Sequence, residues 1–273
     1  MHWQFSFQRA WSLARFELIR LFFTKRGGLA LAAFATAWCL ILYYPVSSAA
    51  DMVSSGAFKD MAAQLFGTLG MSQLLTWQSP ELAIYWLVAA YSFPLFSLYA
   101  ASDQTCADRT RGTLRFISLR ASRTEILLGR FFGQVVILFL LMLLTLVAVV
   151  VMAVYRDSGV FAQTSVQGLV LLKDLVIAVL PFIALMSFFN SFIRSARLAL
   201  VVCLLFFGLT PVFIALLESQ VGALSALNYL LPGIQLKDVI GQQTLELKTY
   251  LIPLGQTFVY LLAGDVIMRR SRL

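Results

Sequence analysis

The sequence has few charged residues. Only 12% of its 273 residues are charged, whereas an ordinary soluble domain has about 25%. Hydrophobic residues make up 60% of the chain, so a soluble fold would lack the polar surface that it needs. Lipid can instead solvate apolar residues on every face of a helix. The composition therefore predicts an all-α integral membrane protein.

Residue types that build catalytic and metal sites are also scarce. His2 is the only histidine, which excludes a histidine-based triad or metal cluster. The three cysteines, Cys39, Cys106 and Cys203, are far apart and predict neither a disulfide framework nor a metal site. No lysine follows a glycine, which excludes the phosphate-binding loop G-x-x-x-x-G-K-[ST]. We therefore expect a chain that is not an enzyme and holds no metal or cofactor. If ATP drives this protein, another chain must bind it.

Long apolar runs are what the sequence has instead. A membrane-crossing helix needs about 20 mostly apolar residues, and six segments qualify: residues 28–46, 82–101, 131–155, 169–189, 198–217 and 250–268. Lys173 and Asp174 interrupt the fourth near its start, and we place them at the outer interface. The expected organisation is an interfacial helix in residues 1–27, with no cleaved signal peptide, followed by a six-helix transmembrane domain in residues 28–273.

Positive charge is distributed unevenly between the connections. Residues 1–27, 102–130, 190–197 and 269–273 together hold 16 lysines and arginines, whereas the connections on the other side hold 5. The positive-inside rule then places both termini in the cytoplasm and the chain in the inner (plasma) membrane. This bias explains the net charge of +8 without a nucleic-acid partner.

The N-terminal segment has apolar residues at helical spacing, with charged residues on another side. This pattern is typical of an amphipathic helix in the membrane interface, with aromatics at headgroup depth and arginines toward anionic lipid. A simple basic cap on the first span is the alternative. The residues assigned to the interfacial helix are Trp3, Phe7, Trp11, Arg15, Glu17 and Arg20.

Further features concern the spans and the outer connections. Residues 47–81 include FKDMAAQLFGTLGM, which suits a short surface helix, and residues 218–249 suit a re-entrant or interfacial helix pair divided at Pro232 and Gly233. Asp265, inside the last span, is expected to form an ion pair with Arg269 one turn later. The spans also contain prolines that can bend them, namely Pro94, Pro181, Pro211 and Pro253.

The stretch DRTRGTLRFISLRASRTEILLGR, residues 108–130, gathers charge between the second and third spans. Leu114, Ile117 and Leu119 predict the apolar face of a short helix. After a break near Ala121, Ser122 can cap a second helix whose third position is a glutamate, as in a capping box. We therefore expect a short cytoplasmic helix that is able to transmit a displacement to the spans on either side.

Residues 108–114 and 122–130 resemble the signature acid-x-x-x-Gly-Thr-Leu … Pro-x-Ser-Arg-x-x-Ile-Leu-x-Gly-Lys of type-two ATP-binding-cassette (ABC) exporter permeases. Residues 14–26 are similar to the opening A-x-x-E-L-x-x-x-x-x-x-R and the interfacial elbow helix of that family. Arg120 stands where the family usually has proline, and Thr110 where a second acid is frequent. These departures put the bend and the salt-bridge pattern in question.

The resemblance implies a permease subunit of an ATP-driven exporter of lipid, drug or peptide. It would pair with a second copy or a sister permease and with two cytoplasmic ABC ATPase subunits, which would bind ATP and Mg²⁺. Membrane lipid and a periplasmic protein are further expected partners. The alternatives are a permease for metalloenzyme maturation of the nitrous-oxide-reductase type, an ATP-independent channel or carrier, and a membrane scaffold. By resemblance, the ATPase-coupling residues are Asp108, Arg111, Gly112, Thr113, Leu114, Arg115, Arg120, Arg123 and Glu125.

Overall fold

The computed structural model describes residues 6–48, 79–218, 227–234 and 247–270, and within these ranges the chain is helical without a strand. Six segments are long and apolar enough to cross a membrane, which confirms the all-α membrane fold. Their helices are α2 (Lys25–Ile41) continued by the π-helical η1 (Leu42–Val46), α5 (Pro80–Ala101), α8 (Arg123–Arg156), α9 (Phe161–Asn190), α10 (Ala196–Glu218) and α12 (Leu247–Arg270).

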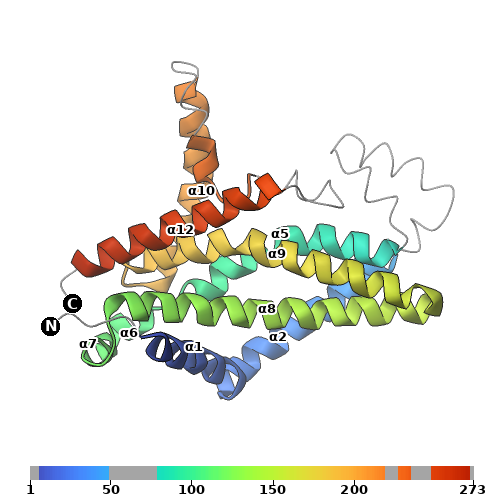
Figure 1. Ribbon diagram of the computed structural model, residues 1–273, viewed down its shortest axis with the longest axis horizontal. Coiled ribbons are helices and arrows are strands. Elements are labelled where there is room, and N and C mark those ends of the chain that lie inside the picture. Colours follow the sequence, from blue (N-terminus) through green and yellow to red (C-terminus); the bar gives the residue numbers. More distant parts are fainter. Residues whose placement is uncertain (1–5, 49–78, 219–226, 235–246, 271–273) are drawn as a thin grey trace.

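Shorter helices connect or precede these segments, among them α1 (Phe7–Phe22), α6 (Cys106–Thr110), α7 (Thr113–Ser118), η3 (Ser158–Val160) and a 3-10 turn at residues 227–230. The helices α6 and α7 lie between α5 and α8, and the end of the bundle that holds them is called the α7 end below. The start of α1 and the end of α12 lie at this same end (Figure 1). The opposite end is the turn from α8 through η3 to α9.

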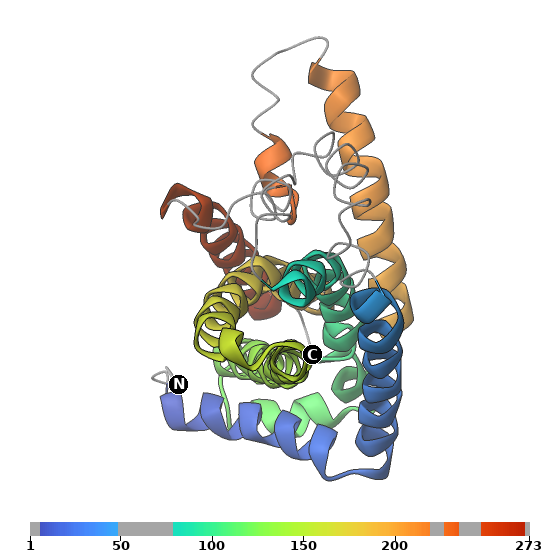
Figure 2. The same cartoon turned by 90° about the vertical axis from the view of Figure 1, so that its right-hand side faces the viewer.

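Helix α9 forms the centre of the bundle. It packs against α5, α8, α10 and α12, and 67% of its most apolar stretch is buried within the chain. Helices α8 and α9 run antiparallel along the long axis of the molecule (Figure 1). The same bundle is seen end-on in Figure 2, where α1, in blue, lies crosswise beside the bundle.

An aromatic cluster attaches α2 to the bundle. Trp38 stacks on Phe93 with ring centroids 5.1 Å apart, and it lies 5.8 Å from the ring of Tyr85. The hydroxyl of Tyr85 lies 3.0 Å from that of Thr145 on α8, so the polar tip of this buried ring has a partner. These contacts order α2, α5 and α8 relative to one another.

Helix α10 diverges from the other helices, as both views show (Figures 1 and 2). Only 17% of its most apolar stretch is buried within the chain. Its exposed residues include Leu204, Leu209 and Phe213. An apolar helix with so little burial needs lipid or a second protein around it.

Two helices begin earlier than the sequence analysis placed their spans. Helix α8 begins at Arg123 instead of residue 131, and α9 begins at Phe161 instead of residue 169. The added turns carry charged or polar residues, which a search for apolar runs does not count. Lys173 and Asp174 therefore lie well inside α9, where the buried Asp174 accepts a 2.6 Å hydrogen bond from the Tyr250 hydroxyl.

Part of the outer connection before α12 packs deep against that helix. The side-chain amide of Gln256 donates to the carbonyls of Tyr229 (2.6 Å) and Leu231 (3.1 Å), and the Tyr260 hydroxyl donates to the carbonyl of Leu230. Gln256 lies about 14 Å along the axis from the start of α12. Residues 227–234 are part of the expected re-entrant or interfacial helix pair, whose position relative to the membrane stays a prediction. Residues 219–226 and 235–246 lie outside the described residues. The surface helix expected within residues 47–81 also lies largely outside them.

Candidate functional site

The turn between α6 and α7 depends on a glycine. Gly112 has φ 73°, in the left-handed region that glycine adopts without steric cost. The Thr113 hydroxyl donates to the Asp108 carboxylate (3.1 Å) and to the Asp108 carbonyl (3.2 Å), which closes the turn. Gly112 therefore forms the bend between α6 and α7.

Helix α7 has one buried and one exposed apolar side. Leu114 is 1% exposed and, with Ile117, packs against the start of α8 and the end of α12. Phe116 and Leu119 are 72% and 70% exposed. The expectation that Leu119 shares the face of Leu114 is wrong, because five residues correspond to about 140° around a helix. The exposed pair therefore forms a separate apolar tip, called the α7 tip below.

The capping box predicted at the start of α8 is confirmed. The Ser122 hydroxyl accepts from the Glu125 amide (3.3 Å), and the Glu125 carboxylate accepts from the Ser122 amide (2.7 Å). Glu125 also accepts a 2.6 Å hydrogen bond from the Ser6 amide and pairs with Arg9 at 3.5 Å. One buried carboxylate thus joins the beginnings of α1 and α8.

Small residues bring α1 close to α8 along the next turns. A Cβ atom on Gly129 would lie 2.7 Å from the Ala10 carbonyl oxygen, and one on Gly133 would lie 3.2 Å from the Ala14 Cα. Both contacts are with backbone atoms of α1, which cannot move aside as a flexible side chain can. Gly129 and Gly133 therefore permit this crossing.

A buried ion cluster lies beside this crossing. Arg130 is 1% exposed, and its two terminal nitrogens pair with Glu17 of α1 and Asp108 of α6. Glu17 is also 1% exposed and pairs with the more exposed Arg20 at 3.4 Å. Such a charge is tolerated in the interior only when paired. The cluster therefore joins α1, α6 and α8 at one side chain.

Helix α6 is also tied to the turn between α9 and α10. The Thr105 hydroxyl donates to the Asn190 carbonyl (3.0 Å), and Arg109 donates to the Ser191 carbonyl (2.7 Å). The side-chain amide of Asn190 donates to the Ala101 carbonyl at the end of α5 (2.7 Å). These bonds satisfy carbonyls at two helix ends.

Cys106 lies within this contact. Its thiol donates to Asn190 Oδ1 (3.2 Å) and to the Ile193 carbonyl (3.4 Å). Burial raises the pKa of the Cys106 thiol to about 11, with a smaller contribution from Asp103 in the same direction and an opposing one from Arg109. The thiol is therefore protonated and structural at neutral pH.

The end of α12 packs on the first turn of α8. Arg123 donates to the Met268 carbonyl, and the Thr124 hydroxyl donates to Asp265 at 2.8 Å. Asp265 and Arg269 form the expected ion pair at 2.9 Å. Arg123 and Glu125, both assigned to ATPase coupling from the sequence, are thus engaged within the chain.

The remaining predicted residues separate into surface and interior. Arg111, Arg115 and Arg120 are exposed around the α7 tip. Of the residues assigned to the interfacial helix, Phe7, Trp11 and Arg15 are exposed on α1 and Arg20 is half-buried. Trp3 lies outside the described residues. The polar side of α1, with Arg9 and Glu17, faces α8. Glu17 is therefore an interior residue, whereas the direction of the arginines toward anionic lipid stays a prediction.

Sequence reasoning missed the role of Arg130 and the two glycines. Arg130 was counted as part of a loop, because the third span was started at residue 131. The run Gly129-Arg-Phe-Phe-Gly133 is a G-x-x-x-G pattern, which marks close helix contacts in membrane proteins. That signal identifies a crossing but not the helix that crosses.

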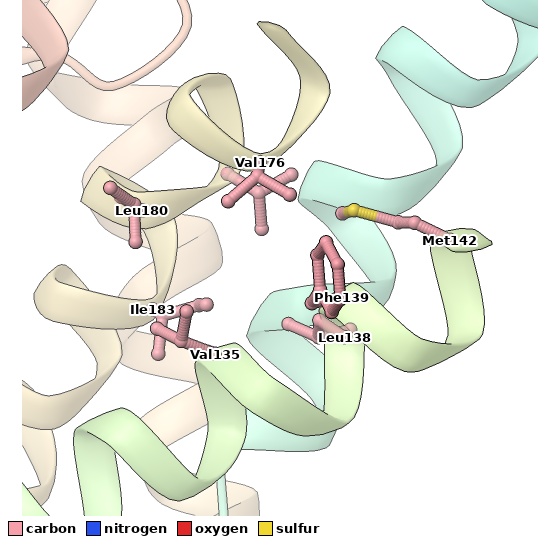
Figure 3. Close-up of a pocket in the computed structure, with 8 residues that line it drawn as sticks. Val135, Leu138, Phe139, Met142, Val176, Leu180 and Ile183 are labelled. Carbon is pink, nitrogen blue, oxygen red and sulfur yellow. The ribbon is translucent and has the colours of Figure 1, made fainter. Parts of the chain in front are cut away.

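An apolar pocket of about 10 Å³, room for about one water molecule, lies between α8 and α9 (Figure 3). Its labelled lining is Val135, Leu138, Phe139, Met142, Val176, Leu180 and Ile183. Among the described residues, no cluster of three or more histidine, cysteine or acidic side chains could hold a metal ion.

The fold and these contacts define a class: a multi-pass, all-α membrane protein with a helical joint between its second and third spans. The chain matches the family described as ABC-2 family transporter protein over residues 15–270, and it belongs to that family. It is therefore an ABC-2 type permease, the transmembrane component of an ABC transporter, and membership implies association with an ABC ATPase. No curated protein gives a significant match to the chain.

Proposed function

We propose that this permease couples ATP hydrolysis in its ATPase partner to the outward movement of a substrate, with the α7 tip as the docking point. The carrying observation is the exposure of Phe116 and Leu119 on a helix whose other side is anchored by Leu114. Two large apolar side chains exposed together on a connecting helix are typical of a protein contact.

The charge around the tip favours an acidic partner surface. Arg111, Arg115 and Arg120 are exposed on the same short segment. Arginine forms bidentate hydrogen bonds with carboxylates and is enriched at protein interfaces. The docking cleft of the ATPase should therefore have an apolar floor and an acidic rim.

The complete transporter, in this proposal, contains two permeases, either two copies or this chain and a sister, and two ATPases. The transporter lies in the inner (plasma) membrane with its α7 end facing the cytoplasm. ATP and Mg²⁺ bind only to the ATPases. The apolar spans favour a lipid, drug or peptide as cargo. Family membership favours this function over an ATP-independent channel or carrier, and identification of the partner ATPase would distinguish export from metalloenzyme maturation.

Co-purification tests the docking point. The tagged permease, purified in mild detergent from its own membranes, should bring down an ABC ATPase that mass spectrometry identifies. Replacing Phe116 and Leu119 together by serine should reduce the bound ATPase about tenfold or more, because truncation of central apolar anchors has effects of that order.

A matched control is Tyr155→Ser, which removes an even more exposed aromatic side chain at the other end of α8. This variant should retain the ATPase at the level of the unmodified chain. Arg115→Glu should weaken binding without lowering the melting temperature, whereas Arg123→Glu should lower the melting temperature because it breaks the contact with α12. Full ATPase binding by both the double-serine variant and Arg115→Glu would contradict the docking point.

A further inference from the structure

The two ion pairs of Arg130 differ in their access to water. Arg130 and Glu17 are each 1% exposed, whereas the Asp108 side chain is 17% exposed. Separating Arg130 from Glu17 would leave Glu17 with the more distant Arg20 and Arg130 with Asp108 alone, both in the interior, which is strongly unfavourable. Asp108 can exchange Arg130 for water with a much smaller loss.

The helices that carry these acids are held to α8 in different ways. Helix α1 is fixed by the Gly129 and Gly133 contacts and by the pair between Arg9 and Glu125. Helix α6 spans five residues, and Asp108 is its ionic link to α8. The α1–α8 pair is therefore one rigid unit, and the printed ion pair between α6 and this unit, that of Asp108, is partly hydrated.

We propose that Arg130 is a positioning residue with one permanent and one reversible ion pair. The pair with Glu17 holds α1 on α8 throughout the transport cycle. The pair with Asp108 opens and closes as the ATPase moves α6 and α7, so that the joint has two defined positions. This inference rests on the proposed function, because it takes the ATPase as the source of the movement.

The structure offers a matched comparison at the two ends of α8. Arg130 pairs with Asp108 at the α7 end, and Arg156 pairs with Glu81 at the other end, at 3.0 Å. Asp108→Asn and Glu81→Gln each neutralise an acid paired with an arginine of the same helix, with almost no change of shape. The first alters the joint and the second does not.

The test measures the ATPase activity of the purified permease–ATPase complex and its melting temperature. Asp108→Asn should retain the ATPase and melt like the unmodified complex but lose about tenfold of the permease-dependent stimulation, the size expected for a charged hydrogen bond. Glu81→Gln should keep full stimulation. Glu17→Gln should lower the melting temperature, because it leaves the buried Arg130 short of a partner.

Conservative replacement separates positioning from folding. Arg130→Met leaves two acids facing each other and should prevent assembly, whereas Arg130→Lys keeps the charge and should restore assembly with part of the stimulation. Full stimulation in Asp108→Asn, or equal losses in Asp108→Asn and Glu81→Gln, would overturn the inference and leave the docking proposal intact. If the unmodified chain binds no ATPase, the proposed function itself fails.

Discussion

Gly129 and Gly133 set how closely α1 can approach α8. We predict that Gly129→Ala destabilises the protein by about 1–3 kcal/mol, because the new methyl group would press on the backbone of Ala10. The control is Gly208→Ala in α10, where an added Cβ meets nothing within 4 Å and the helix should gain slightly. Thermal unfolding in detergent, followed by size-exclusion chromatography, measures both. Equal melting temperatures would show that α1 is not held by this contact.

Cys106 should resist alkylation. Its pKa of about 11 leaves little thiolate at neutral pH, so labelling by N-ethylmaleimide should be more than about a hundredfold slower than for an exposed cysteine. The rate should still rise about tenfold per pH unit between pH 8 and 9, because the thiol ionises only above that range.

The comparison uses a chain in which Cys39 and Cys203 are replaced by alanine, with intact-mass spectrometry as the readout. The control chain also carries Cys106→Ala together with Arg111→Cys, so that its only cysteine lies at an exposed position. Rapid labelling of Cys106 would mean that the contact between α6 and the α9–α10 turn opens readily.

Arg120 shows how a departure from a family pattern is absorbed. Its amide donates to the Ile117 carbonyl at 3.0 Å, and its own carbonyl accepts from Arg9. Proline has no amide hydrogen and could not form the first bond. The chain makes the bend between α7 and α8 with this hydrogen bond and with the Ser122 cap instead.

At the scale of elements, the contact that Gln256 makes between α12 and residues 227–234, called the clamp below, is testable. Gln256→Leu removes both hydrogen bonds to the carbonyls of Tyr229 and Leu231. The bond to Leu231 is buried and that to Tyr229 is part-buried. One unsatisfied buried carbonyl costs about 1–3 kcal/mol, so amide hydrogen exchange across residues 227–234 should increase about tenfold or more. Leu254→Ala alters an exposed residue of the same helix and should leave the exchange unchanged. A similar exchange rate in both variants would count against the clamp.

The elements themselves were largely predictable from the sequence. Apolar runs identified six spans, and Ser122 with Glu125 identified a helix start, because each of these signals is local. The missed features join distant segments, since Glu17 and Arg130 are 113 residues apart in the sequence. A charged residue gives no local sign of whether it faces water or a buried partner. For this reason the sequence placed Glu17 on a surface face and Arg130 in a loop.

At the scale of the whole molecule, the orientation in the membrane is the main prediction. Single cysteines at Arg111 and Ser158, both exposed residues at opposite ends of the bundle, should differ in access. A membrane-impermeant maleimide added to intact spheroplasts should label Ser158→Cys, and Arg111→Cys should react only after the membrane is opened. The reverse pattern would contradict the positive-inside assignment.

Helix α8 is the one long helix among α5, α8, α9, α10 and α12 that contains no proline. Its 34 residues make a rod of about 50 Å, longer than the roughly 30 Å hydrocarbon core of a bilayer. Such a rod has few ways to absorb force by bending. Pivoting by about 6° at its first turns would sweep the far tip through about 5 Å, one helical pitch. The helix thus has the stiffness and length of a lever arm, whose short end carries the ionic joint.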